Sequence, residues 1–158
     1  MICFDKDESR FNFRSVAVII QNEHILIHRA AGDDFWALPG GRVELFETSD
    51  ETIKREIIEE LGMKIEILRQ LWQVENFFEF GSKGYHELAN YFLVKFIDQP
   101  TIEPEIDFDG IEKSVDLIFR WIPLSALTRY NLKPSFLIGK LTDLPNSIES
   151  VKVNERNA

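Results

Sequence analysis

Apolar side chains recur along most of the chain with the spacing of β-strands. Some runs are rich in β-branched residues and others alternate with polar residues, as in strands with one buried face. The predicted strands are residues 13–20, 24–29, 64–80, 85–97 and 116–121. The run 64–80 is expected to bend and to pair with the next run through a turn at residues 81–84. His24 and His28 share a face of the second strand, where half-exposed surface is expected rather than a metal site.

One stretch has helical spacing instead. Ile53 and Ile57 fall on one side of a helix and begin an apolar stripe. Thr48 and Glu51 have the spacing of a capping box, with the two residues after Thr48 as rival caps. Gly62 is placed for a left-handed C-terminal cap. These signals predict a helix that begins near residue 48 and ends at Gly62.

The remainder of the chain predicts loops and short helices. Residues 98–110 contain two prolines and several acids and are expected to form a loop. Short helices are expected at residues 123–127 and 134–141, each of which begins with proline. The polar tail from residue 146 and the N-terminus are expected to be mobile. Without repeats or linkers, residues 1–158 predict a single domain with its core at about residues 13–141.

Three carboxylates gather on the predicted helix. With a step of about 100° per residue, Glu56, Glu59 and Glu60 fall within an arc of roughly 100°. Like charges at this spacing repel each other, and a divalent cation would remove that cost. Such oxygen ligands suit Mg²⁺ or Mn²⁺. A solvated helix with a glutamate-rich face is the alternative interpretation.

A glycine turn, residues 39–41 (PGG), precedes the helix and lets the backbone approach an ion or a phosphate closely. The stretch from residue 40 to residue 63 resembles the Nudix box of the Nudix hydrolase family. The matching positions are Gly41, Glu47, Arg55, Glu56, Ile57, Glu59, Glu60, Gly62 and Met63. Residues 36–41 (WALPGG) are similar to the approach to the box in that family. The chain departs at Leu45-Phe46, where many members have Pro-Gly or a similar turn.

The resemblance implies a fold and an activity. The Nudix fold is an α/β fold, a mixed β-sheet sandwiched between helices (α/β/α), with the box as a loop–helix–loop. Residues 120–124 (RWIPL) also look like the closing strand and helix of that family. Nudix enzymes hydrolyse nucleoside diphosphates linked to another group, and bound metal neutralises the phosphates and activates water. The implied function is Mg²⁺-dependent cleavage of a diphosphate bridge in a small nucleotide substrate, with Mn²⁺ as a substitute.

The resemblance also assigns roles in the box. Glu56, Glu59 and Glu60 are the implied metal ligands, with the Gly40 carbonyl as a further oxygen. One of these glutamates, or another acid from a nearby loop, would act as the general base. The residues do not decide which one.

Four further acidic and basic residues have roles that the sequence leaves partly open. Arg55 and Glu47 are expected to form a structural pair, because a guanidinium seven residues into the helix reaches a carboxylate in the preceding loop. Glu44 is either a ligand or a loop charge. Glu87 either completes the metal set or supplies the base from a strand across the cleft, or it is an outward-facing strand acid.

The substrate-binding candidates are less specific. Arg14, Arg29 and Arg42 are candidates for phosphate contact, although surface arginines commonly have no such role. Trp36 and Phe77, with their aromatic neighbours, would either stack on a base or belong to the core, and the core is favoured. No signature specifies which nucleotide is bound.

Composition narrows the picture further. The net charge of −9 argues against a nucleic-acid polymer as partner, because such binding needs a basic face. The single cysteine, Cys3, excludes an intramolecular disulfide. No apolar run has membrane-spanning length and the first residues do not resemble a signal peptide, so no membrane partner and a cytoplasmic location are expected. A homodimer is compatible with the sequence.

Three functions therefore stay in view. The first is a Mg²⁺-dependent diphosphate hydrolase, which the intact box favours. The second is a catalytically silent nucleotide-binding or regulatory domain with the same fold. The third is a structural domain whose acidic helix is only solvated, and it predicts no specific metal binding.

Overall fold

The computed structural model describes residues 1–156, which form a mixed sheet of nine strands. The strands are β1 (Cys3–Lys6), β2 (Ser9–Gln21), β3 (His24–Ala30), β4 (Gly40–Arg42), β5 (Ile65–Phe80), β6 (Lys83–Phe96), β7 (Phe108–Asp109), β8 (Leu117–Pro123) and β9 (Glu149–Asn154). Their order is β7-β8-β3-β2-β6-β5-β9, and β1 and β4 also pair with β2. The pairs β2–β6 and β5–β9 are parallel, and all the others are antiparallel.

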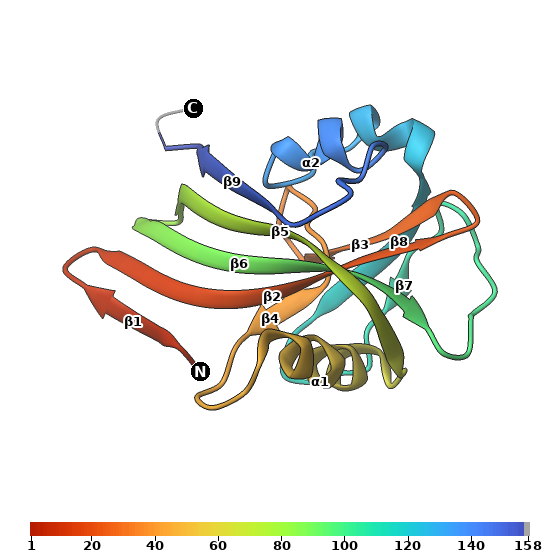
Figure 1. The fold of residues 1–158 in the computed structure, drawn as a ribbon, viewed down its shortest axis with the longest axis horizontal. Coiled ribbons are helices and arrows are strands. Elements are labelled where there is room, and N and C mark those ends of the chain that lie inside the picture. The colour runs from red at the N-terminus through yellow and green to blue at the C-terminus, as the bar shows by residue number, and fades with distance from the viewer. Residues whose placement is uncertain (157–158) are drawn as a thin grey trace.

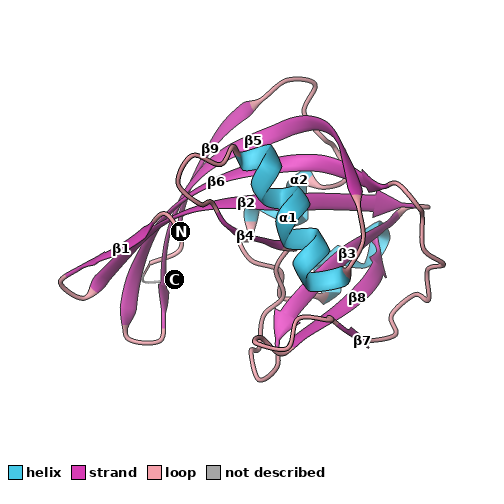
Figure 2. Cartoon of the chain, turned by 90° about the horizontal axis from the view of Figure 1, so that it is seen from below, coloured by secondary structure: helices cyan, strands magenta, loops and turns pink. Residues whose placement is uncertain are grey.

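Helices cover both faces of this sheet (Figure 1). The helix α1 (Ser49–Leu61) lies against one face, and Figure 2 shows it crossing the strands. The 3₁₀ helix η1 (Leu124–Arg129) and the short α2 (Phe136–Lys140) lie on the other side. This arrangement confirms the predicted α/β/α fold with a mixed sheet.

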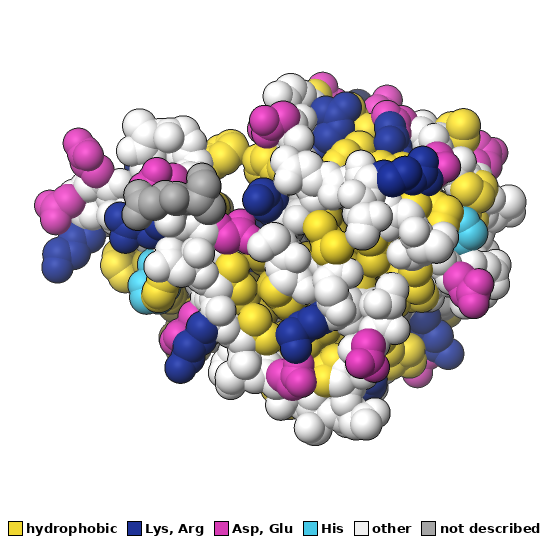
Figure 3. All heavy atoms as spheres, turned by 90° about the horizontal axis from the view of Figure 1, so that it is seen from above, with side chains coloured by type: hydrophobic (Ala, Val, Ile, Leu, Met, Phe, Trp, Pro, Cys, Tyr) yellow, Lys and Arg dark blue, Asp and Glu magenta, His cyan; other side chains and the backbone are white. Residues whose placement is uncertain are grey.

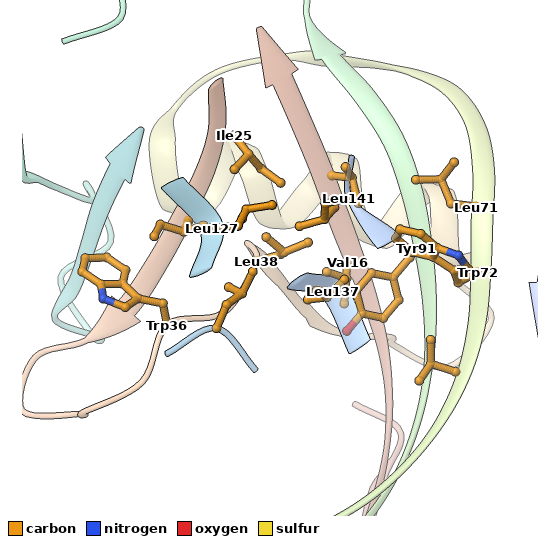
Figure 4. Close-up of a cluster of buried hydrophobic side chains, with 14 of the residues drawn as sticks. Val16, Ile25, Trp36, Leu38, Leu71, Trp72, Tyr91, Leu127, Leu137 and Leu141 are labelled. Carbon is orange, nitrogen blue, oxygen red and sulfur yellow. The ribbon is translucent and has the colours of Figure 1, made fainter. Parts of the chain in front are cut away.

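The core has two parts because each face of the sheet is covered separately. On the side of α2, Val16, Trp72 and Tyr91 from the strands point toward Leu137 of α2 (Figure 4). Under α1, the fully buried Ile53 and Ile57 pack on apolar residues of the opposite sheet face. The predicted apolar stripe of the helix is therefore confirmed. Removing a large buried side chain from either part is expected to cost about 2–5 kcal/mol of folding free energy.

The predicted hairpin is confirmed and is the largest feature of the sheet. Strands β5 and β6 pair from Ile65 and Phe96 to Phe80 and Lys83. The register shifts twice, between residues 67 and 69 and between residues 70 and 72, where β5 bends as predicted. The turn is shorter than expected, because β6 already begins at Lys83.

The structure corrects several boundaries. Both segments expected to be mobile are strands: β1 pairs with β2, and β9 pairs with β5. The predicted loop 98–110 contains the two-residue strand β7. The first strand begins at Ser9 rather than residue 13. The helix predicted at 123–127 is the 3₁₀ helix η1, and the one predicted at 134–141 is restricted to α2. Within residues 1–156, no helix combines the length and apolar character needed to cross a membrane.

Candidate active site

The helix α1 begins and ends where its sequence signals predicted. The backbone N–H of Glu51 donates to Thr48 Oγ1 at 3.2 Å, and the Thr48 N–H donates to Glu51 Oε2 at 3.1 Å. This reciprocal pair is a capping box and selects Thr48 over its rivals. At the other end Gly62 has φ 69° and donates its N–H to the Ile58 carbonyl at 2.8 Å. Both caps fix the helical register that positions the glutamates.

Contacts to the sheet hold the start of α1 in place. Ser15 Oγ on β2 donates to the Ser49 carbonyl at 2.6 Å, and Asn90 Nδ2 on β6 donates to Ser49 Oγ at 2.8 Å. Thr52 Oγ1 donates to Glu47 Oε1 at 2.6 Å, which joins the helix to the preceding loop. The helix therefore meets the sheet in one orientation.

The two glycines of the turn allow a close approach that other residues would block. A Cβ atom on Gly41 would lie 2.0 Å from Cδ of Glu56, and one on Gly40 would lie 2.3 Å from the Ser15 carbonyl oxygen. Gly40 pairs with Val16 of β2 in the sheet. The glycine at position 41 thus leaves the space that the Glu56 carboxylate fills.

Arg55 and Glu47 form the pair predicted from the sequence. Nε and Nη2 of Arg55 donate to the two Glu47 oxygens at 2.8 and 3.0 Å, which is a bidentate arrangement. The Arg55 guanidinium holds the pKa of the Glu47 carboxyl at about 2, well below its usual range. Arg55 also donates to the Arg42 carbonyl at 3.1 Å, so it connects the helix, the loop and β4.

The same guanidinium faces two of the proposed metal ligands. Nη1 of Arg55 lies 2.9 Å from Glu56 Oε1 and 3.2 Å from Glu59 Oε2. Glu59 is the more exposed of these two carboxylates, with a side-chain exposure of 45% against 15% for Glu56. Burial raises the pKa of Glu56, while Arg55 opposes that change. Arg55 therefore holds these two carboxylates beside each other as a counter-ion.

Glu60 is the most buried of the three. Its residue exposure is 4%, and within residues 1–156 its Oε2 atom has no hydrogen-bond partner. Burial, together with the charge of nearby Glu56, raises the pKa of this carboxyl to about 8. An apolar side chain at this position of the helix would have completed the core stripe. A buried, unpartnered carboxylate is costly in a fold unless it binds something.

These side chains line a cavity of about 500 Å³. The predicted site residues that reach it are Arg14, Arg29, Gly40, Glu44, Arg55, Glu56, Glu59 and Glu60. The cavity thus brings together the predicted ligand set and two of the three arginines considered for phosphate contact. At its rim, Glu44 forms an ion pair with the N-terminal ammonium group of Met1.

Five predicted residues lie elsewhere. Glu47 is behind the cavity with Arg55, and Arg42 directs Nη1 to Met1 Sδ at 3.2 Å. Trp36 is 8% exposed and belongs to the core, with the Arg29 guanidinium over its ring at 5.1 Å.

Phe77 packs edge-on against the His86 ring at a centroid distance of 4.7 Å. Glu87 is 6% exposed and lines a second, adjoining cavity. The interpretation of Glu87 as an outward-facing strand acid is therefore wrong, because it is buried.

Two residues of the cavity were missed in the sequence. His28 was expected on a half-exposed surface, but it is 8% exposed and packs on Phe119 at a centroid distance of 5.3 Å. Burial lowers the pKa of His28 to about 3, and the charge of Arg14 contributes. Glu112 enters from the loop after β7, which is held against the helix by a 2.8 Å bond from the Ile111 N–H to the Glu60 carbonyl. No local sequence pattern predicts that His28 or Glu112 lines this cavity.

The chemistry of this donor set fits a hard divalent cation. Carboxylate oxygens from α1 share the cavity with the backbone of Gly40, and Glu60 Oε2 is an orphaned acceptor. In the part of the chain that the structure describes, no three acidic, histidine or cysteine side chains are gathered into a preformed metal cage. The Arg55 guanidinium contacts Glu56 and Glu59 instead. The candidate oxygen donors for Mg²⁺ or Mn²⁺ in this cavity are Glu56, Glu59, Glu60 and Gly40.

The chain is similar in sequence to known proteins. MutT4 of Mycobacterium tuberculosis (strain CDC 1551 / Oshkosh) is 25% identical over 92 residues, which are 58% of this chain and 34% of that protein. The chain spans about a third of the length of the curated relatives it matches.

Solved structures show the same fold. A MutT NUDIX hydrolase from Burkholderia pseudomallei is similar with a TM-score of 0.57 and 27% identity, over 73% of this chain and 84% of that one. A MutT protein from Bacillus halodurans has a TM-score of 0.66 and 12% identity over 92% and 91% of the two chains, a likeness of fold alone. The model of the NUDIX domain family matches residues 12–138, which include α1 and every residue that lines the glutamate cavity except Met1. The chain therefore belongs to the NUDIX domain family.

Proposed function

We propose that this protein is a metal-dependent hydrolase that cleaves the diphosphate bridge of a nucleoside diphosphate linked to another group. The observation that carries the proposal is the Glu60 carboxylate, buried beside Glu56 with an unpartnered oxygen in a cavity that also contains arginines. A solvated acidic helix would not bury this group. Membership of the NUDIX family supports the same reaction class.

The chain's own residues divide the work in this reaction. Glu56, Glu59, Glu60 and the Gly40 backbone would hold Mg²⁺ or Mn²⁺. A bound ion would neutralise the phosphate charge and lower the pKa of a water molecule bound to it. Arg14 lines the same cavity and would contact the phosphates.

Arg55 has a positioning role. It fixes the orientation of Glu56 while its bidentate contact with Glu47 fixes its own. Arg29 also lines the cavity and is a second cation for a phosphate. The base that takes the proton from water would be a carboxylate of this cavity. Apart from the three helix glutamates, Glu44 is the candidate in this cavity that the sequence analysis considered. The cytoplasmic location and the homodimer stay predictions from the sequence.

Turnover of a panel of nucleotides in Mg²⁺ or Mn²⁺, read as released phosphate after phosphatase coupling, tests this function. Glu59→Gln and Glu60→Gln keep the side-chain shape and remove a charged ligand. Each should lower the rate about a hundredfold, equivalent to about 3 kcal/mol of transition-state stabilisation. Glu75→Gln, on the exposed face of β5, is the matched control and should keep full turnover.

The outcomes separate the competing functions. Full turnover in either helix variant contradicts the ligand assignment for that residue. Specific Mg²⁺ binding without turnover of any nucleotide indicates a silent binding domain. No specific Mg²⁺ binding indicates a structural helix.

A further inference from the structure

A second cavity of about 320 Å³ opens beside the glutamate cavity. The two share Arg14, Phe35 and Ala37 as lining residues. A ligand with its diphosphate near the box glutamates can therefore extend into the second cavity past Arg14. The Nη1 atom of Arg14 lies 3.8 Å from Oε1 of Glu87, which belongs to the second cavity.

Glu87 and Asn76 line the second cavity and belong to a polar row across three neighbouring strands. Asn12 on β2 and Asn76 on β5 are both register partners of Glu87 on β6. All three are at least nine-tenths buried, with exposures of 2%, 5% and 6% for Asn12, Asn76 and Glu87. Two residues along from Asn76 and Glu87, the same sheet face carries the core residues Val74 on β5 and Ala89 on β6, whereas β2 carries Arg14 at the matching position. The polar row thus begins where the core ends.

Hydrogen bonding within this row is incomplete. Asn12 Nδ2 donates to Glu87 Oε1 at 2.9 Å, which orients the carboxylate. Within residues 1–156, Glu87 Oε2 accepts no hydrogen bond from the protein, and Oδ1 of Asn76 is buried without a partner. Buried polar groups in folded proteins are generally paired, so the buried Asn76 Oδ1 points to a ligand that donates to it, and Glu87 Oε2 is open to the same ligand.

The walls of the cavity are aromatic. Phe35 and Phe80 meet edge-to-face at 6.0 Å and 82°, and Phe78 stacks on Tyr85 at 4.9 Å and 11°. Lys133, from the segment before α2, lines the cavity as well. Figure 3 looks onto the α2 side, where hydrophobic side chains reach the surface between Lys, Arg, Asp and Glu. Flat apolar walls with a few polar groups on the floor suit a heteroaromatic ring.

Resting on the proposed function, we propose that the second cavity binds the base of the nucleotide and selects guanine through Glu87 and Asn76. Guanine is the one common base whose edge presents two adjacent donors, N1–H and the 2-amino group, and a carboxylate accepts both. Adenine places the N1 acceptor against Glu87, cytosine places N3 there, and uracil offers one donor between two carbonyls. Lys133 donates to the guanine O6 or N7 acceptors. Glu87 is thus a specificity residue and neither a metal ligand nor the base.

Binding of nucleoside monophosphates tests this without any turnover. Isothermal titration of the wild-type protein with GMP, IMP and AMP in EDTA should show GMP binding at least about tenfold tighter than AMP. IMP lacks the 2-amino group and should bind with intermediate affinity. Equal affinities for GMP and AMP would overturn the proposal, and this comparison needs no variant.

Variants separate the base site from the metal site. In Glu87→Gln the ratio of GMP to AMP affinity should fall at least about fivefold, whereas Glu66→Gln, an exposed acid at the far end of β5, should keep the wild-type ratio. With metal and guanosine- and adenosine-linked diphosphates, Glu87→Gln should lower kcat/KM for the guanosine substrate only. An equal loss for both substrates would make Glu87 part of the metal site and overturn the proposal. Turnover without base preference overturns this inference alone, and base preference without turnover overturns the hydrolase proposal alone.

Discussion

Glu60 gives the metal-free protein a pH-dependent stability that one substitution tests. Burial raises the pKa of its carboxyl from 4.5 to about 8 in the folded state. Because the folded state then binds the proton more tightly than the unfolded chain, this group's stabilising contribution is fully present below pH 4.5. It is lost as the pH rises through 8. Glu60→Gln has nearly the same shape but does not ionise, so it should remove this dependence.

The size of the effect follows from the two pKa values. Between them, each pH unit changes the free energy of unfolding by about 1.4 kcal/mol. From pH 5 to pH 8, the wild type should lose on the order of 3 kcal/mol of stability relative to Glu60→Gln. Glu59→Gln leaves the Glu60 carboxyl in place, so it should keep most of the pH dependence of the wild type.

Urea unfolding in EDTA at pH 5, 6, 7 and 8 measures this difference for the three proteins. The difference between two proteins in the free energy of unfolding at each pH cancels the contributions of the other titrating groups. The wild type and Glu60→Gln should diverge steadily above pH 5, with Glu60→Gln the more stable. Parallel curves for these two proteins would refute the argument that burial of Glu60, with an unpartnered oxygen, raises its pKa.

Four further outcomes are expected. Millimolar Mg²⁺ should raise the melting temperature because it binds only the folded arrangement, and an equal rise from Na⁺ at matched ionic strength would indicate mere screening. Gly41→Ala should displace Glu56 and weaken Mg²⁺ binding about tenfold in titration while the fold persists, whereas Gly40→Ala meets a backbone carbonyl and should lower the melting temperature. His28, with a folded pKa of about 3 against 6.5, makes the wild type lose about 2 kcal/mol from pH 7 to pH 5, and His28→Phe should lack that loss in urea unfolding. Phe46→Gly should stabilise by about 1 kcal/mol in the same assay, because Phe46 is fully exposed at φ 65°.

The helix and its surroundings were predictable because their signals are local. The capping box of Thr48 and Glu51, the apolar stripe and the cap at Gly62 all depend on neighbours within one or two turns. The reach from Arg55 to Glu47 also follows from their short separation. The same locality explains the hairpin of β5 and β6, which a turn of a few residues connects.

The rest depends on pairings between distant segments. The row of Asn12, Glu87 and Asn76 exists only because β2 and β6 run parallel in one register, and no pattern in either strand specifies that register. Burial of Glu60 depends on the loop that Ile111 brings against the end of the helix. Each charge on α1 looks alike in the sequence, and the tertiary contacts decide which one is buried.

The last strand, β9, has a practical consequence for any shortened version of the protein. It pairs in parallel with β5 from Trp72 to Phe77, and the Glu155 N–H after it donates to the Phe77 carbonyl at 2.7 Å. Trimming the chain before Glu149 would leave a bare sheet edge of the kind that recruits other chains into aggregates. It would also remove Glu155, which lines the second cavity. The Ser135 N–H donates to Glu155 Oε1 at 2.7 Å, so this contact would be lost as well. Expression of the domain with its polar tail intact is therefore the condition for a monodisperse, ligand-competent preparation.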